Sequence, residues 1–163
     1  MPTIIEERRI ASTTKDLAKF TERVLHEWLF TAGFGISKNV ETAADIKEST
    51  VVDPNMGGLR WIITKVDRQA GWIQYEMDPS TNLMGGPALT LYKGELQITE
   101  DADGIDDDDS CYYRLVYKVE YKLSLALTIL SFGVFYFSTQ DMIRTLMQKD
   151  MERIQKVEAN SGR

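Results

Sequence analysis

The chain has 163 residues, of which 43% are hydrophobic and 27% are charged, and its formal net charge is -6. This length and composition are typical of one globular domain and differ from those of a disordered chain. The acidic balance argues against nucleic acid as a partner, because phosphate binding requires clustered lysine and arginine side chains.

The cysteine content and the N-terminal residues bear on the compartment. Cys111 is the single cysteine, so an intramolecular disulfide is impossible and a reducing compartment is expected. Charges at residues 6–9 occupy the region where a secretory signal peptide needs an apolar core. The stretch 123–140 has no charge, but polar and small residues interrupt it, and a membrane span needs about 20 mainly apolar residues. We therefore predict a cytoplasmic protein without stable membrane insertion.

The first predicted elements are a strand and an amphipathic helix. Residues 3–11 combine isoleucines with paired charges, which is typical of a short, partly exposed strand. Apolar residues then recur at spacings of three and four, the pattern of a helix of about four turns. They are Leu17, Phe20, Val24 and Trp28. Thr13 or Thr14 is expected to cap this helix, and Gly33 lies near its expected end.

The middle of the chain alternates apolar and polar residues, as antiparallel strands do. The alternation begins at residues 40–47. Runs at 59–66 and 72–77, joined by a short connection that contains glycine, predict a hairpin. Residues 88–99 and 111–123 predict two further strands, separated by an acidic loop.

A long C-terminal helix is the last predicted element. Apolar residues recur at helical spacing from Phe132 to Val157, and charged residues occupy much of the remaining circumference. Residues 158–163 are expected to fray. No internal repeat and no linker divides the sequence, so we predict a single domain spanning residues 1–163.

The order of elements is strand, helix, a series of antiparallel strands and one long helix. A single helix can cover such a sheet only if the sheet curves around it. In this order, and in the segment from Phe135 to Ile143, the sequence resembles the START-like superfamily, also called Bet v 1-like or SRPBCC proteins. The resemblance implies an α+β helix-grip fold, in which a curved antiparallel β-sheet wraps around the C-terminal α-helix and encloses an apolar cavity.

The resemblance implies a hydrophobic small molecule as the partner, because members of this superfamily hold lipids, sterols, polyketides or plant metabolites between sheet and helix. Some members are enzymes and others only carry a ligand, so fold similarity does not decide whether this chain is an enzyme. One hypothesis is a cofactor-independent, polyketide-cyclase-like enzyme of cyclase or isomerase type that uses tyrosine hydroxyls. The alternative is a non-catalytic carrier of a lipid, sterol or other metabolite. A third hypothesis is that the protein is a dimerising adaptor. We expect the protein to be a monomer or a homodimer.

Three tyrosines at intervals of four residues mark the predicted strand 111–123. Alternation places Tyr113, Tyr117 and Tyr121 on its inner face, where their hydroxyls need partners. They form either a cavity wall with polar groups for a ligand or a core whose tyrosines satisfy one another. Tyr113 and Tyr117 are the candidate catalytic tyrosines.

Further lining residues are expected from the other strands and the C-terminal helix. Methionine suits such a lining because its thioether adapts to irregular ligands, although methionines at helical spacing also form plain core. The predicted ligand-binding residues are Tyr75, Met77, Tyr92, Tyr113, Tyr117, Tyr121, Phe135, Met142, Leu146 and Met147. Thr90 is expected on the same side of its strand as Tyr92.

His26 is the only histidine, and it is either the general base of an enzyme or a solvated helix residue. One histidine and one cysteine do not make a zinc site, and the acidic run 101–109 lacks the spacing of an EF-hand. The glycine pairs at residues 57–58 and 85–86 match no phosphate-binding fingerprint. We therefore predict no metal and no cofactor. Alternation places Glu76 and Glu95 on the outer face of the sheet.

Overall fold

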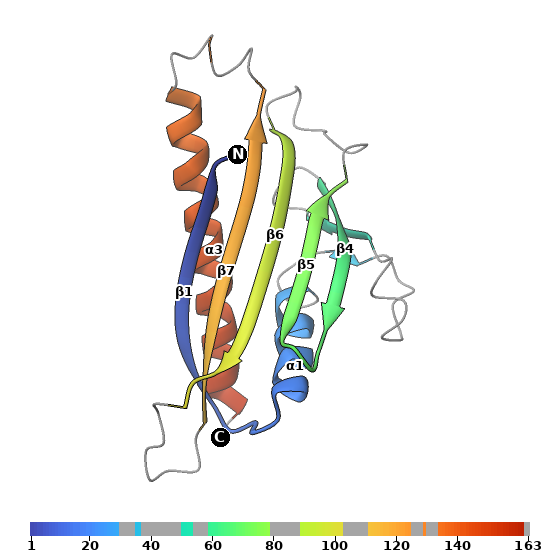
Figure 1. Cartoon of the computed structure of the whole chain (residues 1–163), viewed down its shortest axis with the longest axis vertical. Coiled ribbons are helices and arrows are strands. Elements are labelled where there is room, and N and C mark those ends of the chain that lie inside the picture. The colour runs from blue at the N-terminus through green and yellow to red at the C-terminus, as the bar shows by residue number, and fades with distance from the viewer. Residues whose placement is uncertain are drawn as a thin grey trace.

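The chain forms an antiparallel β-sheet with a long helix on one face (Figure 1). A computed structural model describes residues 1–29, 35–36, 50–53, 59–78, 89–102, 111–124, 129 and 134–161. The strand expected at residues 40–47 lies outside the described residues. The α+β class predicted from the sequence is confirmed.

Seven strands of the described chain are hydrogen-bonded in the order β1-β7-β6-β5-β4-β3-β2. Every neighbouring pair is antiparallel. The strands are β1 (Thr3–Ser12), β2 (Gly35–Ile36), β3 (Thr50–Asp53), β4 (Leu59–Asp67), β5 (Trp72–Met77), β6 (Leu89–Glu100) and β7 (Cys111–Leu123). The first strand therefore pairs with the last, while β2 to β6 each pair with the next strand along the chain.

β4 and β5 form the predicted hairpin, and its turn requires glycine. Gly71 has a φ of 62°, in the left-handed region that glycine adopts without strain. Its carbonyl accepts a 2.7 Å hydrogen bond from the amide of Ile98 on β6. A Cβ at position 71 would lie 2.3 Å from the Ile98 carbonyl oxygen. The close approach of β6 and the backbone angle therefore both exclude a side chain here.

β6 departs from regular alternation near its beginning. The β6–β7 register shifts between Leu89 and Leu91. Thr90 is exposed, whereas Tyr92 is buried. The prediction that both face the same side is wrong, because a one-residue irregularity moves a side chain to the opposite face.

α1 (Leu17–Leu29) begins directly after its cap, Asp16. The Asp16 Oδ1 atom accepts hydrogen bonds from the backbone amides of Ala18 at 2.8 Å and Lys19 at 3.1 Å. The prediction that Thr13 or Thr14 caps this helix is therefore wrong. A carboxylate is an equally good cap and also complements the helix dipole.

α3 (Val134–Ser161) runs along the sheet behind β1 and β7 in Figure 1. It contacts β1 and, toward its C-terminal end, α1. Its buried side chains recur at helical spacing and face the sheet. They include Ile143, Met147, Met151 and Ile154.

A buried ion pair holds the C-terminal end of α3. The Glu158 side chain is 3% exposed and pairs with Arg23 of α1, with 3.1 Å between Oε1 and Nη2. Its other oxygen accepts a 2.7 Å hydrogen bond from Ser12 Oγ at the end of β1. The helix continues to Ser161, beyond residue 158, where fraying was expected to begin. The ion pair supplies a tertiary anchor that the local sequence does not reveal.

β7 confirms the predicted alternation. Its buried side chains are Tyr113, Leu115, Tyr117, Val119 and Tyr121. The intervening residues are half-buried or exposed. The buried face joins side chains from β1, β4, β5, β6, α1 and α3 in one apolar cluster.

Candidate functional site

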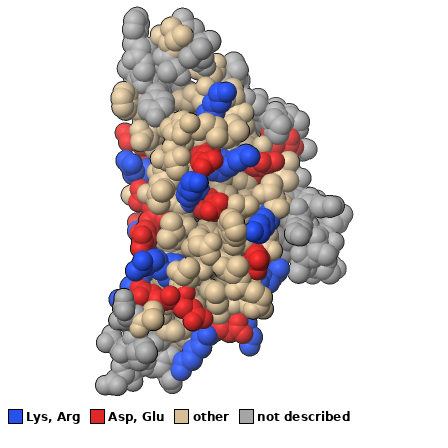
Figure 2. Space-filling view, in the orientation of Figure 1, with Lys and Arg blue, Asp and Glu red and all other residues tan. Residues whose placement is uncertain are grey.

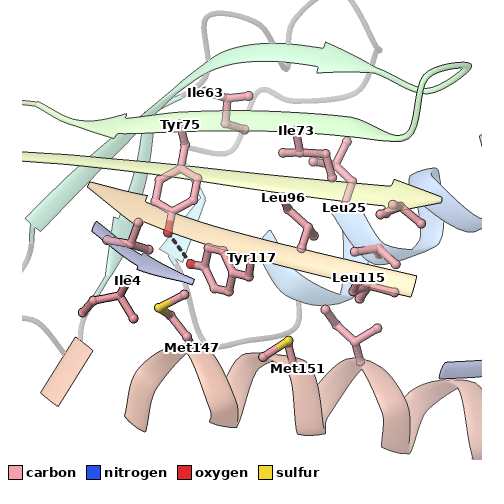
Figure 3. Close-up of a cluster of buried hydrophobic side chains, with 14 of the residues drawn as sticks. Ile4, Leu25, Ile63, Ile73, Tyr75, Leu96, Leu115, Tyr117, Met147 and Met151 are labelled. Atoms are coloured by element: carbon pink, nitrogen blue, oxygen red, sulfur yellow. Dashed lines mark hydrogen bonds between the residues drawn. The ribbon is translucent and has the colours of Figure 1, made fainter. Parts of the chain in front are cut away.

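Three tyrosines from neighbouring strands meet between the sheet and α3. Tyr75 lies on β5, Tyr92 on β6 and Tyr117 on β7, and their exposed fractions are 6%, 5% and 3%. Figure 3 shows the Tyr75 and Tyr117 side chains pointing toward each other, with Met147 on α3 close by. We call Tyr75, Tyr92 and Tyr117 the tyrosine cluster.

Gly94 allows the Tyr75 ring to reach across β6. The two residues are directly opposite in the β5–β6 register. A Cβ at position 94 would lie 2.0 Å from Tyr75 Cζ and 2.4 Å from its hydroxyl oxygen. Only glycine therefore leaves room for this ring position. The sequence prediction missed Gly94, although a glycine inside a strand is a known sign of close approach by another group.

The hydroxyls of Tyr75 and Tyr117 are hydrogen-bonded to each other. The ring centroids of Tyr75 and Tyr92 are 6.1 Å apart. Burial raises the pKa of Tyr75 well above its ordinary value of 10.0, and the neighbouring Tyr117 and Tyr92 raise it further. Burial likewise raises the pKa of Tyr117, and Tyr92 and Asp150 add to the effect. Both phenols are therefore neutral hydrogen-bond donors near pH 7 rather than tyrosinate bases.

α3 supplies apolar side chains beside the tyrosine cluster. Met147 and Met151 are 0% and 1% exposed, and Leu146 is half-buried. Met142, predicted as a lining residue, is 44% exposed and does not join the buried cluster. The residue next to it, Ile143, takes the buried position, because consecutive residues of a helix point about 100° apart.

Tyr113 occupies a different environment from Tyr117. Its ring stacks on Phe20 of α1, with centroids 4.0 Å apart and an interplanar angle of 11°. Its hydroxyl donates a 2.7 Å hydrogen bond to the Thr14 carbonyl. Along a strand, four residues span about 13 Å. The structure thus separates the two candidate catalytic tyrosines and brings Tyr117 together with Tyr75 instead.

The remaining predicted residues have mixed placements. Met77 and Tyr121 are buried, at 6% and 0% exposure, and Tyr121 is opposite Tyr92 in the β6–β7 register. His26 lies in α1 and Phe135 in α3. The side chains of His26 and Phe135 lie outside the described part of the structure.

The sequence prediction also missed Asp150, a largely buried acidic residue of α3 whose charge acts on the tyrosine cluster. Its side chain is 17% exposed, and its Oδ1 lies 3.5 Å from Nη1 of Arg153. Its negative charge is among the causes that raise the pKa values of Tyr75 and Tyr117. The sequence did contain an indication of this position, because Asp150 follows Met147 by three residues and so lies within the apolar stripe of the helix.

The outer face of the sheet carries interleaved charges (Figure 2). A pocket of about 190 Å³ is lined by several of them. Glu76 and Glu95 line it, so both lie on the outer face as predicted. Lys118 and Glu120 form an ion pair of 2.7 Å, and Lys93 lies 3.8 Å from Glu76. These charges pair with one another on a solvated surface, and such pairs contribute little to stability.

Among the described residues, no helix combines the length and the apolar character needed to cross a membrane.

No family model and no curated protein matches the sequence. Solved structures do match along the whole chain. Protein XoxI from Bacillus cereus superimposes with a TM-score of 0.63 at 10% identity, covering 100% of this chain and 99% of that one. The chain has the helix-grip fold.

Two further helix-grip structures are enzymes of biosynthesis by name. The di-domain ARO/CYC protein BexL has a TM-score of 0.60 at 8% identity, covering 96% of this chain and 46% of that one. Norcoclaurine synthase from Thalictrum flavum has a TM-score of 0.54 at 14% identity, covering 99% and 98%. At these identities the similarity establishes the fold alone.

Proposed function

We propose that residues 1–163 form a single domain that binds a hydrophobic small molecule between the sheet and α3. The observation that carries this proposal is the tyrosine cluster, whose three side chains converge in the interior among apolar residues. Few polar groups in apolar surroundings are typical of small-molecule sites. Neutral phenols at this position suit a carbonyl or phenol oxygen of the ligand.

The first form of this function is a cofactor-independent enzyme of cyclase or isomerase type. The names of BexL and norcoclaurine synthase support it by analogy of fold. Because the pKa values of Tyr75 and Tyr117 are raised, their hydroxyls would stabilise negative charge that develops on a substrate oxygen, rather than remove a proton. Holding a flexible substrate in one conformer would contribute further to the rate.

The second form is a non-catalytic carrier of a lipid, sterol or other hydrophobic metabolite. The hydroxyl pair of Tyr75 and Tyr117 supports it, because the two phenols provide a polar anchor among buried apolar side chains. A carrier needs only an apolar site with such a polar anchor.

Native mass spectrometry of protein purified from its own source tests the site directly. A lipid-like or polycyclic compound released in near-stoichiometric amount supports the proposal and identifies the ligand class. Protein without any bound compound would contradict a tight carrier.

Titration with 2-naphthol, a hydrophobic phenol, tests the role of the tyrosine cluster. Tyr117→Phe should weaken binding roughly fivefold, the effect of one lost hydrogen bond of ~1 kcal/mol. The matched control is Tyr113→Phe, whose hydroxyl is bonded to the Thr14 carbonyl and should not affect binding. Equal effects of both changes, or no binding to the unmodified protein, would contradict the proposed site.

A further inference from the structure

We infer that Asp150 determines the ligand class: the site accepts apolar molecules that carry a hydroxyl or an amine and rejects those that carry a carboxylate. This inference rests on the proposed ligand site and narrows it. It would exclude simple fatty acids from the carrier hypothesis.

The position of Asp150 on α3 is the first observation. Asp150 follows Met147 by three residues and precedes Ile154 by four, so the three side chains share one face of the helix. Met147 and Ile154 are buried at 0% and 3% exposure. The Asp150 side chain is itself only 17% exposed. A carboxylate therefore lies on the side of α3 that meets the sheet, where burial of an acid is costly unless it has partners.

The charge of Asp150 acts on the tyrosine cluster. Met147, which precedes Asp150 by three residues on the same face of α3, lies close to Tyr75 and Tyr117 in Figure 3. In keeping with this position, the Asp150 charge raises the pKa values of both tyrosines. The nearby cation, Arg153, has a side chain that is 39% exposed. Solvent therefore screens the arginine more than the carboxylate. The interior retains negative character beside two neutral phenols.

Donors and an acceptor thus lie in one polar cluster. The phenols of Tyr75 and Tyr117 can donate to a ligand oxygen, and the Asp150 carboxylate can accept from a ligand hydroxyl or amine. A ligand carboxylate would add a second negative charge in surroundings of low dielectric constant. For unit charges about 6 Å apart at an effective dielectric constant of about 20, this repulsion weakens binding on the order of a hundredfold, and solvent screening reduces the effect toward tenfold.

Three probes with the same apolar body test the inference: 2-naphthol, 2-(aminomethyl)naphthalene and 2-naphthoic acid. Calorimetric titration of the unmodified protein near pH 7 should show the acid binding at least tenfold more weakly than the phenol or the amine. In Asp150→Asn the difference between acid and amine should fall to about threefold or less. Asp141→Asn is the matched control, since it removes the same charge from an exposed position of α3 and should keep the full preference.

The outcomes separate the inference from the function on which it rests. If the acid binds the unmodified protein as tightly as the phenol, or if Asp150→Asn keeps the full preference, the inference is overturned while the ligand site stands. If none of the probes binds, both the inference about Asp150 and the proposed ligand site are overturned. The urea midpoint of Asp150→Asn checks that the variant is folded. Should it not fold, the order of affinities in the unmodified protein decides by itself.

Discussion

The two ends of the β7 segment from Tyr113 to Tyr117 differ in the hydrogen-bond partners of their tyrosine hydroxyls. Tyr113 stacks on Phe20 and donates to a backbone carbonyl, that of Thr14. Tyr117 bonds to the side chain of Tyr75 from another strand. The two residues share a strand, a face and nearly complete burial, at 0% and 3% exposure.

This difference separates a structural tyrosine from a candidate functional one. A backbone carbonyl is fixed by the fold, and the hydroxyl bonded to it contributes to stability. A hydroxyl bonded to another side-chain hydroxyl can exchange that partner for a ligand at little cost, since one hydrogen bond replaces another. Tyr113 and Tyr117 are the same residue type on the same face of one strand, so the hydrogen-bond partner of each hydroxyl is what distinguishes them.

The largest expected effect comes from removing the ion pair beside the Tyr113 end. Arg23→Ala leaves the Glu158 carboxylate buried without its cation. Loss of one partner of a buried pair costs about 3 kcal/mol, and the 32% exposure of Arg23 places the effect at the lower end of the usual range. Urea unfolding at neutral pH measures it, and 2-naphthol binding by the folded protein should be unchanged.

The matched control for this prediction is Arg8→Ala. Arg8 lies 3.9 Å from Glu152, whose side chain is 54% exposed. Its loss should cost less than about 1 kcal/mol. Equal losses in the two variants would mean that the Glu158 ion pair does not hold the end of α3.

Gly94→Ala disturbs the other end, at the tyrosine cluster. The added Cβ would fall 2.0 Å from the Tyr75 ring and must displace it. Overpacking of this kind costs about 2 kcal/mol, and ligand binding should weaken as the Tyr75 hydroxyl moves. Urea unfolding in a double-mutant cycle with Tyr75→Ala identifies the cause, because the alanine should be tolerated once the ring is gone. If Gly94→Ala costs the same with Tyr75 and with Ala at position 75, the clash with the Tyr75 ring is not the cause of the destabilisation.

Alkaline pH should destabilise the fold through its buried tyrosines. The pKa values of Tyr75, Tyr117 and Tyr113 are raised above 10.0, so above that pH the folded state holds protons that the unfolded state releases. The tyrosines contribute their full stabilisation to the free energy of unfolding below about pH 10. As the pH rises further this stabilisation is lost, at up to ~1.4 kcal/mol per pH unit for each tyrosine. Urea midpoints between about pH 9 and 11 measure the slope. Tyr117→Phe should make it shallower, and an unchanged slope would contradict the burial argument.

Apart from the Arg8→Ala control, the smallest expected effect is that of Tyr113→Phe. The variant loses the 2.7 Å hydrogen bond to Thr14 and keeps the ring stacked on Phe20. The free energy of unfolding should fall by about 1 kcal/mol, measured by urea unfolding. A loss of ligand binding larger than that of Tyr117→Phe would reverse the assignment of roles to the two ends.

Patterns along a single element were predicted well from the sequence. The alternation of β7 is confirmed because a strand turns successive side chains to opposite faces whatever its neighbours are. The β4–β5 hairpin and the long α3 follow from turn chemistry and helical periodicity, which are equally local.

Features that depend on a partner elsewhere in the chain were not predicted. Glu158 was assigned to a fraying end, yet Ser12 and Arg23 bind it across more than a hundred residues of sequence. Thr90 was placed on the wrong face because the irregularity that turns it outward arises from pairing with β7. Met142 was predicted to line the ligand site, yet its side chain is 44% exposed, because the rotation of the helix against the sheet decides which residues of α3 are buried.

The sequence alone therefore determined both helices, the strands β1 and β4 to β7, and the presence of tyrosines on the inner faces of β5, β6 and β7, but not the short strands β2 and β3. The tertiary structure decided which tyrosines meet, because the register of β5, β6 and β7 and the gap at Gly94 bring Tyr75 to Tyr117. It also decided that the Asp150 side chain is only 17% exposed, since the packing of α3 on the sheet sets which part of its circumference is buried. Periodicity is a property of one segment, whereas the partner of a hydroxyl is set by contacts between segments far apart in the chain.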